Sequence, residues 1–290
     1  MIKNISFLGL GVMGFPMAGH LATKTDLNVT VYNRTASRAA QWAHEYNGTI
    51  ATTPAAAAQD ADIVFVCVGN DDDLTQVLTH SEGVIETIKT GAIIVDHTTV
   101  SAAISRQMHQ TFKAKDVSFI DAPVSGGQAG AQNGLLSVMC GGDQAAFDIA
   151  APIMRGVYGK EVRRIGDSGA GQTAKMLNQI CIAATLQGLA EALAFGQKAG
   201  LDMEAVLAVI SQGAAQSWQM TNRSQTMLKD QFDFGFALDW MIKDLDIALD
   251  EAERHHAPLP GTQTILEYYK ELSAQGYGRM DTSALIKRLR

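Results

Sequence analysis

Cysteine is scarce in this sequence. The three cysteines among 290 residues, Cys67, Cys140 and Cys181, lie far apart, and each has apolar neighbours. That pattern fits buried thiols in a reducing compartment better than a disulfide framework. A metal site is not expected either, because His255 and His256 have no partner at the spacing of metal ligands.

Basic charge and long apolar runs are also lacking. The formal net charge is -7, and no stripe of basic residues offsets it, which argues against nucleic-acid binding. The longest apolar run, from Ile63 to Val68, is about a third of the roughly 20 residues that a membrane-spanning helix requires, so we expect no membrane span. Glycines interrupt the apolar residues after Lys3 and no small-residue cleavage site follows, so we expect a cytoplasmic protein without a signal peptide.

The pattern of strand and helix signals changes near the middle of the sequence. From residue 1 to about residue 165, short β-rich apolar runs alternate with helical segments, which predicts βαβ units and a mainly parallel sheet. After Gly166 the strand signals stop and helical patterns continue to Arg290. We therefore predict an α/β domain over residues 1–165 and an all-α domain over residues 166–290. The expected strands are, in order, IKNISFLG, VTVYN, TIA, DIVFVCV, AIIVD, VSFIDAP, LLSVMCGG and EVRRIG.

A glycine-rich turn follows the first expected strand. In FLGLGVMGFPMAGHL, Gly9, Gly11 and Gly14 have the spacing G-x-G-x-x-G, with a strand before them and a helix after them. Glycine is selected where the backbone needs a positive φ or where another group must approach it closely. The motif alone is weak evidence, but in this context the candidate for the approaching group is the pyrophosphate of a dinucleotide.

The end of the next strand bears on the identity of that dinucleotide. An NAD site has Asp or Glu here for the ribose hydroxyls, whereas this chain has Asn33, Arg34 and Thr35. A carboxylate would repel a 2′-phosphate, but Asn33 and Arg34 can hydrogen-bond and pair with one, so NADP is the predicted cofactor. The alternative is that Arg34 is an ordinary surface arginine at the end of a strand.

A second glycine-rich loop has the sequence DAPVSGGQAGAQNG, from Asp121 to Gly134. Ser125 supplies a hydroxyl, and Gly126 and Gly127 supply backbone N–H groups that a small carboxylate can approach without steric hindrance. The alternative is a flexible turn at the edge of the sheet.

The second half begins with a long segment that lacks proline. As one helix, Ala170 to Gly200 would be about 45 Å long, and its apolar or small residues predict burial on most faces, including in a dimer core. Lys175, Asn178 and Gln179 lie on one face of it. An ammonium beside a hydride acceptor stabilises and then protonates the alkoxide that forms, and the neutral amine serves the reverse reaction. The alternative is a lysine that extends its ammonium to solvent from the start of a helix.

One further segment, KDLDIAL, places Lys243 four residues after Asp239 and next to Asp244. From the residues alone, this spacing favours an ion pair on a helix surface.

Together these segments resemble the β-hydroxyacid dehydrogenase family, which includes 3-hydroxyisobutyrate dehydrogenase, tartronate semialdehyde reductase, the glyoxylate and succinic semialdehyde reductases and 6-phosphogluconate dehydrogenase. GLGVMGFPMAGHL resembles the family's cofactor signature, DAPVSGG its substrate loop, GAGQTAKMLNQ the start of its catalytic helix and KDLDIAL its C-terminal cofactor-contacting segment. The resemblance covers essentially the whole chain. It implies a Rossmann domain with a mainly parallel, doubly wound sheet, then an all-α domain that begins with a long helix, assembled as a homodimer or homotetramer.

The same resemblance implies a reaction and a role for each motif. It implies NADP-dependent hydride transfer between nicotinamide and a small carboxylate-bearing 3-hydroxy acid or semialdehyde, with Lys175 as general acid and base, assisted by Asn178. Lys243 would then contact the cofactor instead of forming a surface ion pair. The implied substrate residues are Ser125, Gly126, Gly127, Asn178 and Gln179. The implied cofactor residues are Gly9, Leu10, Gly11, Val12, Met13, Gly14, Asn33, Arg34, Thr35, Val68, Thr99 and Lys243.

Three positions depart from the family pattern. His20 replaces a usual Asn, Gly69 replaces a common proline, and Gln179 stands where hydroxyisobutyrate enzymes have a second Asn, which leaves the exact acid open. Two other functions remain as alternatives. Imine reductases share the architecture but generally lack a lysine at this position, so Lys175 disfavours them. A catalytically silent cofactor-binding module would be expected to lose that lysine first.

Overall fold

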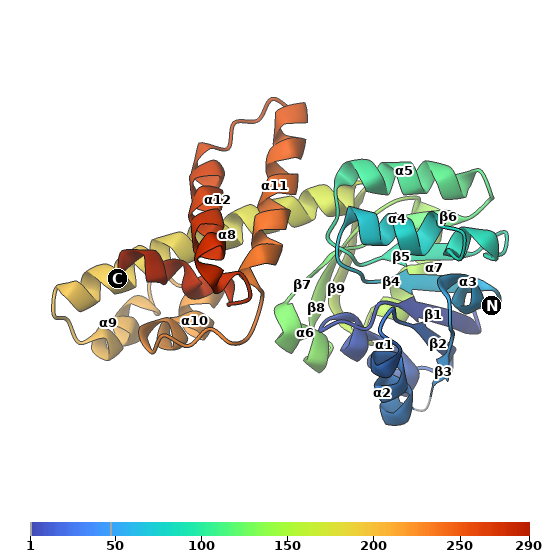
Figure 1. Cartoon of the computed structure of the whole chain (residues 1–290), viewed down its shortest axis with the longest axis horizontal. Helices are drawn as coiled ribbons and strands as arrows, with labels where there is room; N and C mark the ends of the chain where they lie inside the picture. Colours follow the sequence, from blue (N-terminus) through green and yellow to red (C-terminus); the bar gives the residue numbers. More distant parts are fainter. Residues whose placement is uncertain (1, 47) are drawn as a thin grey trace. The chain divides into compact units, whose positions relative to one another are not determined.

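The computed structural model describes residues 2–46 and 48–290, and the chain divides into two compact units, Met1–Lys175 and Met176–Arg290 (Figure 1). The boundary expected from the sequence, between residues 165 and 166, lies at the end of the last strand. The helix α8 (Ala170–Lys198) therefore begins in the first unit and continues into the second.

The first unit contains one sheet with strands in the order β3-β2-β1-β4-β5-β6-β8-β7, and β9 pairs with β8. The six strands from β3 to β6 are parallel, in the order 3-2-1-4-5-6 that defines the Rossmann fold, whereas β8 is antiparallel to β6 and β7. The predicted fold class is thus confirmed. The strands are β1 (Asn4–Leu8), β2 (Asn28–Tyr32), β3 (Thr49–Ile50), β4 (Ile63–Val66), β5 (Ile93–Asp96), β6 (Ser118–Asp121), β7 (Val124–Ser125), β8 (Leu136–Gly141) and β9 (Gly159–Gly166).

Hydrophobic clusters cover both faces of this sheet. Successive residues of β4 alternate between them: Ile63 and Phe65 belong to one cluster, and Val64 and Val66 to the other. A strand buried on both faces has no polar positions, which explains the unbroken apolar run there. One face is covered by α1 (Gly14–Lys24), α2 (Ala36–Tyr46), α6 (Gly127–Asn133) and α7 (Gln144–Met154), and the other by α3 (Pro54–Ala58), α4 (Asp71–Thr79) and α5 (Ala102–Lys113).

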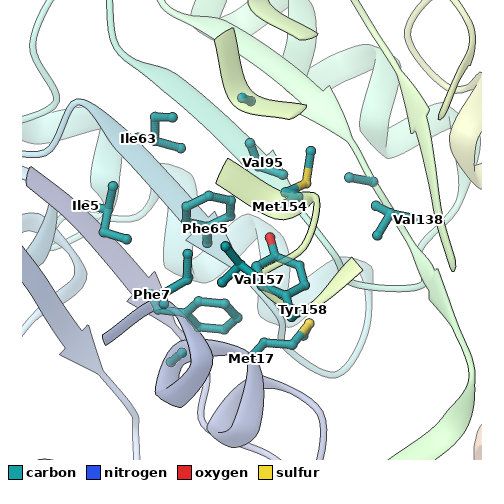
Figure 2. Packing of buried hydrophobic residues seen from close by; sticks show 14 of the residues in the cluster. Ile5, Phe7, Met17, Ile63, Phe65, Val95, Val138, Met154, Val157 and Tyr158 are labelled. Carbon is teal, nitrogen blue, oxygen red and sulfur yellow. The ribbon is translucent and has the colours of Figure 1, made fainter. Parts of the chain in front are cut away.

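Aromatic rings fill the centre of the first cluster. Figure 2 shows Phe7, Phe65 and Tyr158 grouped there, and the rings of Phe7 and Phe65 stack with centroids 6.1 Å apart. The hydroxyl of the fully buried Tyr158 lies 2.8 Å from Nε2 of His97, whose Nδ1 lies 2.6 Å from the carbonyl oxygen of Ala122. Burial lowers the pKa of His97 to about 4, so this imidazole is neutral at physiological pH and acts as part of the core.

The second unit is helical in its described residues, as the sequence predicts. Its core is formed by one side of α8 with the later helices, and includes Leu186, Leu193, Met241, Leu245 and Tyr269. After α8 come α9 (Met203–Ile210), α10 (Trp218–Leu228), α11 (Leu238–Arg254) and α12 (Pro260–Leu272), then a π-turn η2 (Ser273–Tyr277) and a 3-10 segment η3 (Thr282–Leu289).

Within the single chain, α8 is buried on one side only. Leu177 is 59% exposed and Phe195 is 73% exposed, and Cys181 on the same side is an exposed thiol, whereas the sequence predicted a buried one. Among the described residues, α8 is also long and apolar enough to cross a membrane by composition. A core helix of a soluble domain passes the same test, and the residues of α8 that pack in the helical core indicate that role.

Candidate active site

The three glycines of the first turn meet three different steric demands. Gly9 has φ +97°, and a Cβ there would lie 2.1 Å from the carbonyl oxygen of Cys67. A Cβ on Gly14 would lie 1.9 Å from the carbonyl oxygen of Gly9, so α1 packs directly on the turn. Gly11 meets nothing within 4 Å. It therefore leaves the open backbone that a pyrophosphate requires, at the start of a helix whose N–H groups attract anions.

Side chains from the next strand end hold this turn in place. The N–H of Leu10 donates to Oδ1 of Asn33 at 2.8 Å, and the carbonyl oxygen of Leu10 accepts from Nε of Arg38 at 3.0 Å. The guanidinium of Arg38 also lies 4.1 Å from the ring centre of Phe15. Asn33 thus supports the glycine turn from the end of β2. Arg38 was missed from the sequence, where its only signal was its place on the first turn of the following helix.

The proposed 2′-phosphate residue Arg34 projects from the surface. Its side chain is 77% exposed, and its Nη1 lies 2.9 Å from Oδ1 of Asp73 in the first turn of α4. Thr35 is exposed beside it, and Val12 in the glycine turn is 58% exposed, whereas Met13, the cap residue of α1, is partly buried. Sequence reasoning did not identify Asp73, because its contact with Arg34 joins segments 39 residues apart.

The turns after β4 and β5 are joined by a hydrogen-bonded chain. The N–H of Val68 donates to Oγ1 of Thr98 at 3.0 Å, and the N–H of Thr98 donates to Oδ1 of Asp96 at 2.9 Å. Val68 and Thr99, the two residues expected along the nicotinamide, therefore belong to connected turns, and both are partly buried. Burial, with smaller effects from neighbouring carboxylates, raises the pKa of Asp96 to about 7 against the hydrogen bonds from Thr98.

A buried carboxylate connects the substrate loop to the start of α8. Oδ1 of Asp121 accepts from the N–H of Gly169 at 2.7 Å, and its Oδ2 accepts from the N–H of Gln172 at 3.0 Å. These bonds satisfy N–H groups that a helix leaves unpaired at its N-terminus. Lys175 lies one turn later and is 7% exposed. Burial raises the pKa of Asp121, and the hydrogen bonds from the helix start oppose that rise.

Gln172 extends this docking to the turn after β5. Its Nε2 donates to the carbonyl oxygen of Thr98 at 2.7 Å, and its Oε1 accepts from the N–H of Val100 at 3.2 Å. Gly171 permits the close approach, because a Cβ there would lie 2.3 Å from the carbonyl oxygen of Met139. The helix that carries Lys175 is thereby fixed to the end of β6 and to the turn after β5, which holds Thr99.

The substrate loop itself is open. Ser125 ends the two-residue strand β7, which the sequence did not predict, and is partly buried. Gly126 and Gly127 follow with φ +132° and +62°, both are exposed, and a Cβ on Gly127 would meet nothing within 4 Å. Positive φ and open backbone are the properties required of a carboxylate cradle made of N–H groups.

In the second unit, four polar residues form a connected chain. Asn178 Nδ2 donates to Gln179 Oε1 at 2.8 Å, and Gln179 Nε2 donates to Oδ2 of the buried Asp244 at 2.5 Å. Lys243 completes the chain, since its Nζ lies 2.9 Å from Oδ1 of Asp244. Asp244 joins α8 to α11 and was noted in the sequence only as a partner of Lys243.

Each unit thus gathers some of the predicted residues. The first brings the glycine turn to Asn33, links Val68 to the turn that holds Thr99, and docks the helix start of Lys175 on Asp121. The second joins Asn178, Gln179 and Lys243. Within residues 2–46 and 48–290, no three His, Cys, Asp or Glu side chains are arranged to hold a metal ion. The donor set fits a dinucleotide and a small carboxylate.

Comparison with known proteins agrees with this geometry. The model of the NAD binding domain of 6-phosphogluconate dehydrogenase matches residues 4–166. The model described as NAD-binding of NADP-dependent 3-hydroxyisobutyrate dehydrogenase matches residues 169–289. Together the two models span nearly the whole chain.

Individual relatives are similar over their full length. An uncharacterized oxidoreductase of Shewanella frigidimarina is 55% identical over 99% of this chain and 98% of that protein. The 2-hydroxy-3-oxopropionate reductase of Escherichia coli is 33% identical over 99% of this chain and 97% of that protein. The crystal structure of 3-hydroxyisobutyrate dehydrogenase from Salmonella typhimurium matches with a TM-score of 0.88 at 30% identity, over 99% of both chains. This chain therefore belongs to the β-hydroxyacid dehydrogenase family and is a nicotinamide-dependent oxidoreductase that acts on the CH–OH groups of hydroxy acids.

Proposed function

We propose that the chain transfers a hydride between NADP(H) and a small 3-hydroxy acid or its semialdehyde, with Lys175 as general acid and base. The observation that supports this best is the pair of hydrogen bonds from Gly169 and Gln172 to Asp121. These bonds tie the helix that carries Lys175 to the loop that presents Ser125, Gly126 and Gly127. Two relatives, from E. coli and S. typhimurium, are named as enzymes that act on acids or semialdehydes of this class.

The chemistry required of the chain follows from the charge that develops on the substrate. The turn of Gly9, Gly11 and Gly14 would hold NADPH, which would supply a hydride for the carbonyl carbon. The N–H groups of Gly126 and Gly127 hold the substrate carboxylate, which fixes the orientation of the carbonyl. The carbonyl oxygen becomes an alkoxide, and the ammonium of Lys175 stabilises it and then donates a proton to it. In the oxidation direction, the neutral amine of Lys175 accepts the hydroxyl proton.

The preference for NADP rests on the end of β2. No carboxylate occurs among Asn33, Arg34 and Thr35, and the exposed guanidinium of Arg34 can form charge-assisted hydrogen bonds to a 2′-phosphate. The description of the family model that matches residues 169–289 also names an NADP-dependent 3-hydroxyisobutyrate dehydrogenase.

We also propose that a second copy of the chain covers the exposed side of α8. The exposed positions recur every three or four residues along the helix, at Leu177, Cys181, Ala184, Gly188, Ala192 and Phe195. Apolar residues at that spacing form the seam of paired helices, and the small residues allow close approach. A homodimer built on this face, or a tetramer of such dimers, would bury it.

The activity is tested by following NADPH absorbance with purified protein. The panel contains succinic semialdehyde, glyoxylate, tartronate semialdehyde and methylmalonate semialdehyde, with 3-hydroxyisobutyrate and L-serine plus NADP for the reverse direction, and a cyclic imine as control. Turnover of an acid or semialdehyde that is lost in Lys175→Ala supports the proposal. Turnover of the imine alone, or none on the whole panel while NADPH still binds, contradicts it.

A further inference from the structure

The guanidinium proposed to bind the 2′-phosphate already has an acidic partner. Nη1 of Arg34 lies 2.9 Å from Oδ1 of Asp73, and the two side chains are 77% and 26% exposed. An ion pair this exposed contributes little to folding stability. The charge pair can therefore be altered without unfolding the domain, and its main effect is on whatever else approaches Arg34.

The backbone of α4 fixes the place of Asp73. Asn70 caps this helix, because its Oδ1 accepts from the N–H of Asp73 at 2.8 Å. Asp71, at the start of the helix, accepts from the N–H and the hydroxyl of Ser101 at 2.9 Å and 2.5 Å. The first turn is thus anchored at two points. The carboxylate of Asp73 is held beside the end of β2 and does not depend on a mobile loop.

The sheet order explains why this carboxylate faces the cofactor. Strands β2 and β4 flank β1, so Arg34, after β2, and Asp73, after β4, lie on either side of the glycine turn that follows β1. In this fold the adenine ribose binds at the end of β2. A phosphate paired with the guanidinium of Arg34 would contact the same group as the Asp73 carboxylate, and like charges that close repel even in water.

We propose that Asp73 is a cofactor-specificity residue that lowers the affinity for NADPH and leaves the affinity for NADH unchanged. It competes with the 2′-phosphate for Arg34 and repels its negative charge, whereas NADH has no group at that position. The chain therefore uses both cofactors more evenly than Arg34 alone would allow. This inference rests on the 2′-phosphate contact in the proposed function.

The test compares dissociation constants for NADPH and NADH, measured by tryptophan fluorescence or calorimetry without substrate. Asp73→Asn is expected to bind NADPH about three- to tenfold more tightly than the unaltered protein at about 20 mM salt, with NADH changed less than about twofold. The gain is expected to shrink at about 500 mM salt, because exposed charges are then screened. A merely structural role for Asp73 would not produce that dependence on salt and cofactor.

Asp72→Asn is the matched control. Asp72 is exposed in the same helical turn, so its loss removes the same charge from the protein and from the N-terminus of α4. An equal gain in NADPH affinity in both variants would overturn the proposal, since net charge would then explain it. Unchanged or weaker NADPH binding in Asp73→Asn would also overturn it.

Arg34→Ala separates this inference from the proposed function. If Arg34→Ala weakens NADPH selectively while Asp73→Asn has no effect, the 2′-phosphate contact stands and only the role of Asp73 is wrong. If Arg34→Ala weakens NADPH and NADH equally, the 2′-phosphate contact is wrong and the role of Asp73 falls with it.

Discussion

The carboxylate of Asp121 accepts a hydrogen bond from the backbone N–H of Gln172, in the first turn of α8, with 3.0 Å between N and Oδ2. This bond makes the last residue of β6 the cap of the helix that carries Lys175. The side chain of Gln172 also donates a hydrogen bond to the carbonyl oxygen of Thr98, in the turn after β5. Three segments that are distant in the sequence therefore meet at the carboxyl edge of the sheet, where ligands bind in open α/β folds.

Gly171→Ala tests how tightly this junction is packed. The new Cβ would lie 2.3 Å from the carbonyl oxygen of Met139 and 2.6 Å from that of Asp121, and both are backbone atoms that cannot move independently. We expect the free energy of unfolding to fall by about 2–3 kcal/mol and turnover to fall with it, as measured by urea denaturation and the NADPH assay. Gly261→Ala on α12 is the control, because its Cβ meets nothing and should be neutral or slightly stabilising. Equal stability of the two variants would refute the steric role.

Lys175 is tested with two substitutions. Lys175→Ala removes both charge and proton, and we expect turnover to fall by about 10²- to 10⁴-fold with little change in the dissociation constant of NADPH. Lys175→Arg keeps the charge but cannot exchange a proton at neutral pH, so it should be nearly as inactive. Substantial activity in Lys175→Arg would mean that the residue acts only through its charge, and full activity in Lys175→Ala would remove its role.

Much of the fold could be predicted from the sequence because the relevant signals are local. The run from Ile63 to Val68 is apolar on both faces of its strand, and the three glycines of the first turn adjoin the strand and helix that they connect. The eight expected strands all occur, and the all-helical second half does too. The strand β7 was missed because its two residues, Val124 and Ser125, carry no period and owe their conformation to pairing with β8.

The contacts that complete the site were less accessible because they join distant segments. Asp73 meets Arg34, and Asp244 meets Gln179, across 39 and 65 residues. No spacing rule encodes such pairs. The sequence of α8 predicted burial on most faces, but an apolar sequence does not reveal whether the neighbours of each face belong to the same chain or to another copy.

Arg34→Ala is expected to discriminate between cofactors. Loss of a charge-assisted contact to the 2′-phosphate should raise the dissociation constant of NADPH by about 10- to 100-fold, while that of NADH changes little. Arg38→Ala provides the contrast, because Arg38 supports the carbonyl oxygen of Leu10 in the turn that both cofactors share. It should weaken the two cofactors alike. Equal losses in Arg34→Ala would contradict the 2′-phosphate contact.

Asp96→Asn is expected to change how stability depends on pH. Burial raises the pKa of Asp96 from 3.8 to about 7, so between these values the folded protein keeps a proton that the unfolded chain releases. The contribution of the protonated Asp96 carboxyl to folding stability is therefore fully present below the pKa of the unfolded chain. It is lost as the pH rises through about 7.

Asparagine has a similar shape and does not ionise. We therefore compare the free energy of unfolding of Asp96→Asn with that of the unaltered protein by urea denaturation. As the pH rises from about 5 to about 8, the difference should shift in favour of the variant by roughly 2–3 kcal/mol. A difference that does not vary over this range would show that Asp96 titrates normally.

Phe195→Glu tests the proposed contact between copies of α8. Phe195 is 73% exposed, and a carboxylate buried in an apolar interface would leave an unpaired charge there, which is strongly unfavourable. We expect the unaltered protein to have a multiple of its subunit mass of 31.0 kDa by light scattering or sedimentation, and the variant to dissociate toward a single subunit. Val209→Glu on α9 is the matched control, because Val209 is also 73% exposed but lies off the α8 face. Retention of the assembly in Phe195→Glu, or equal dissociation in both variants, would exclude α8 as the interface.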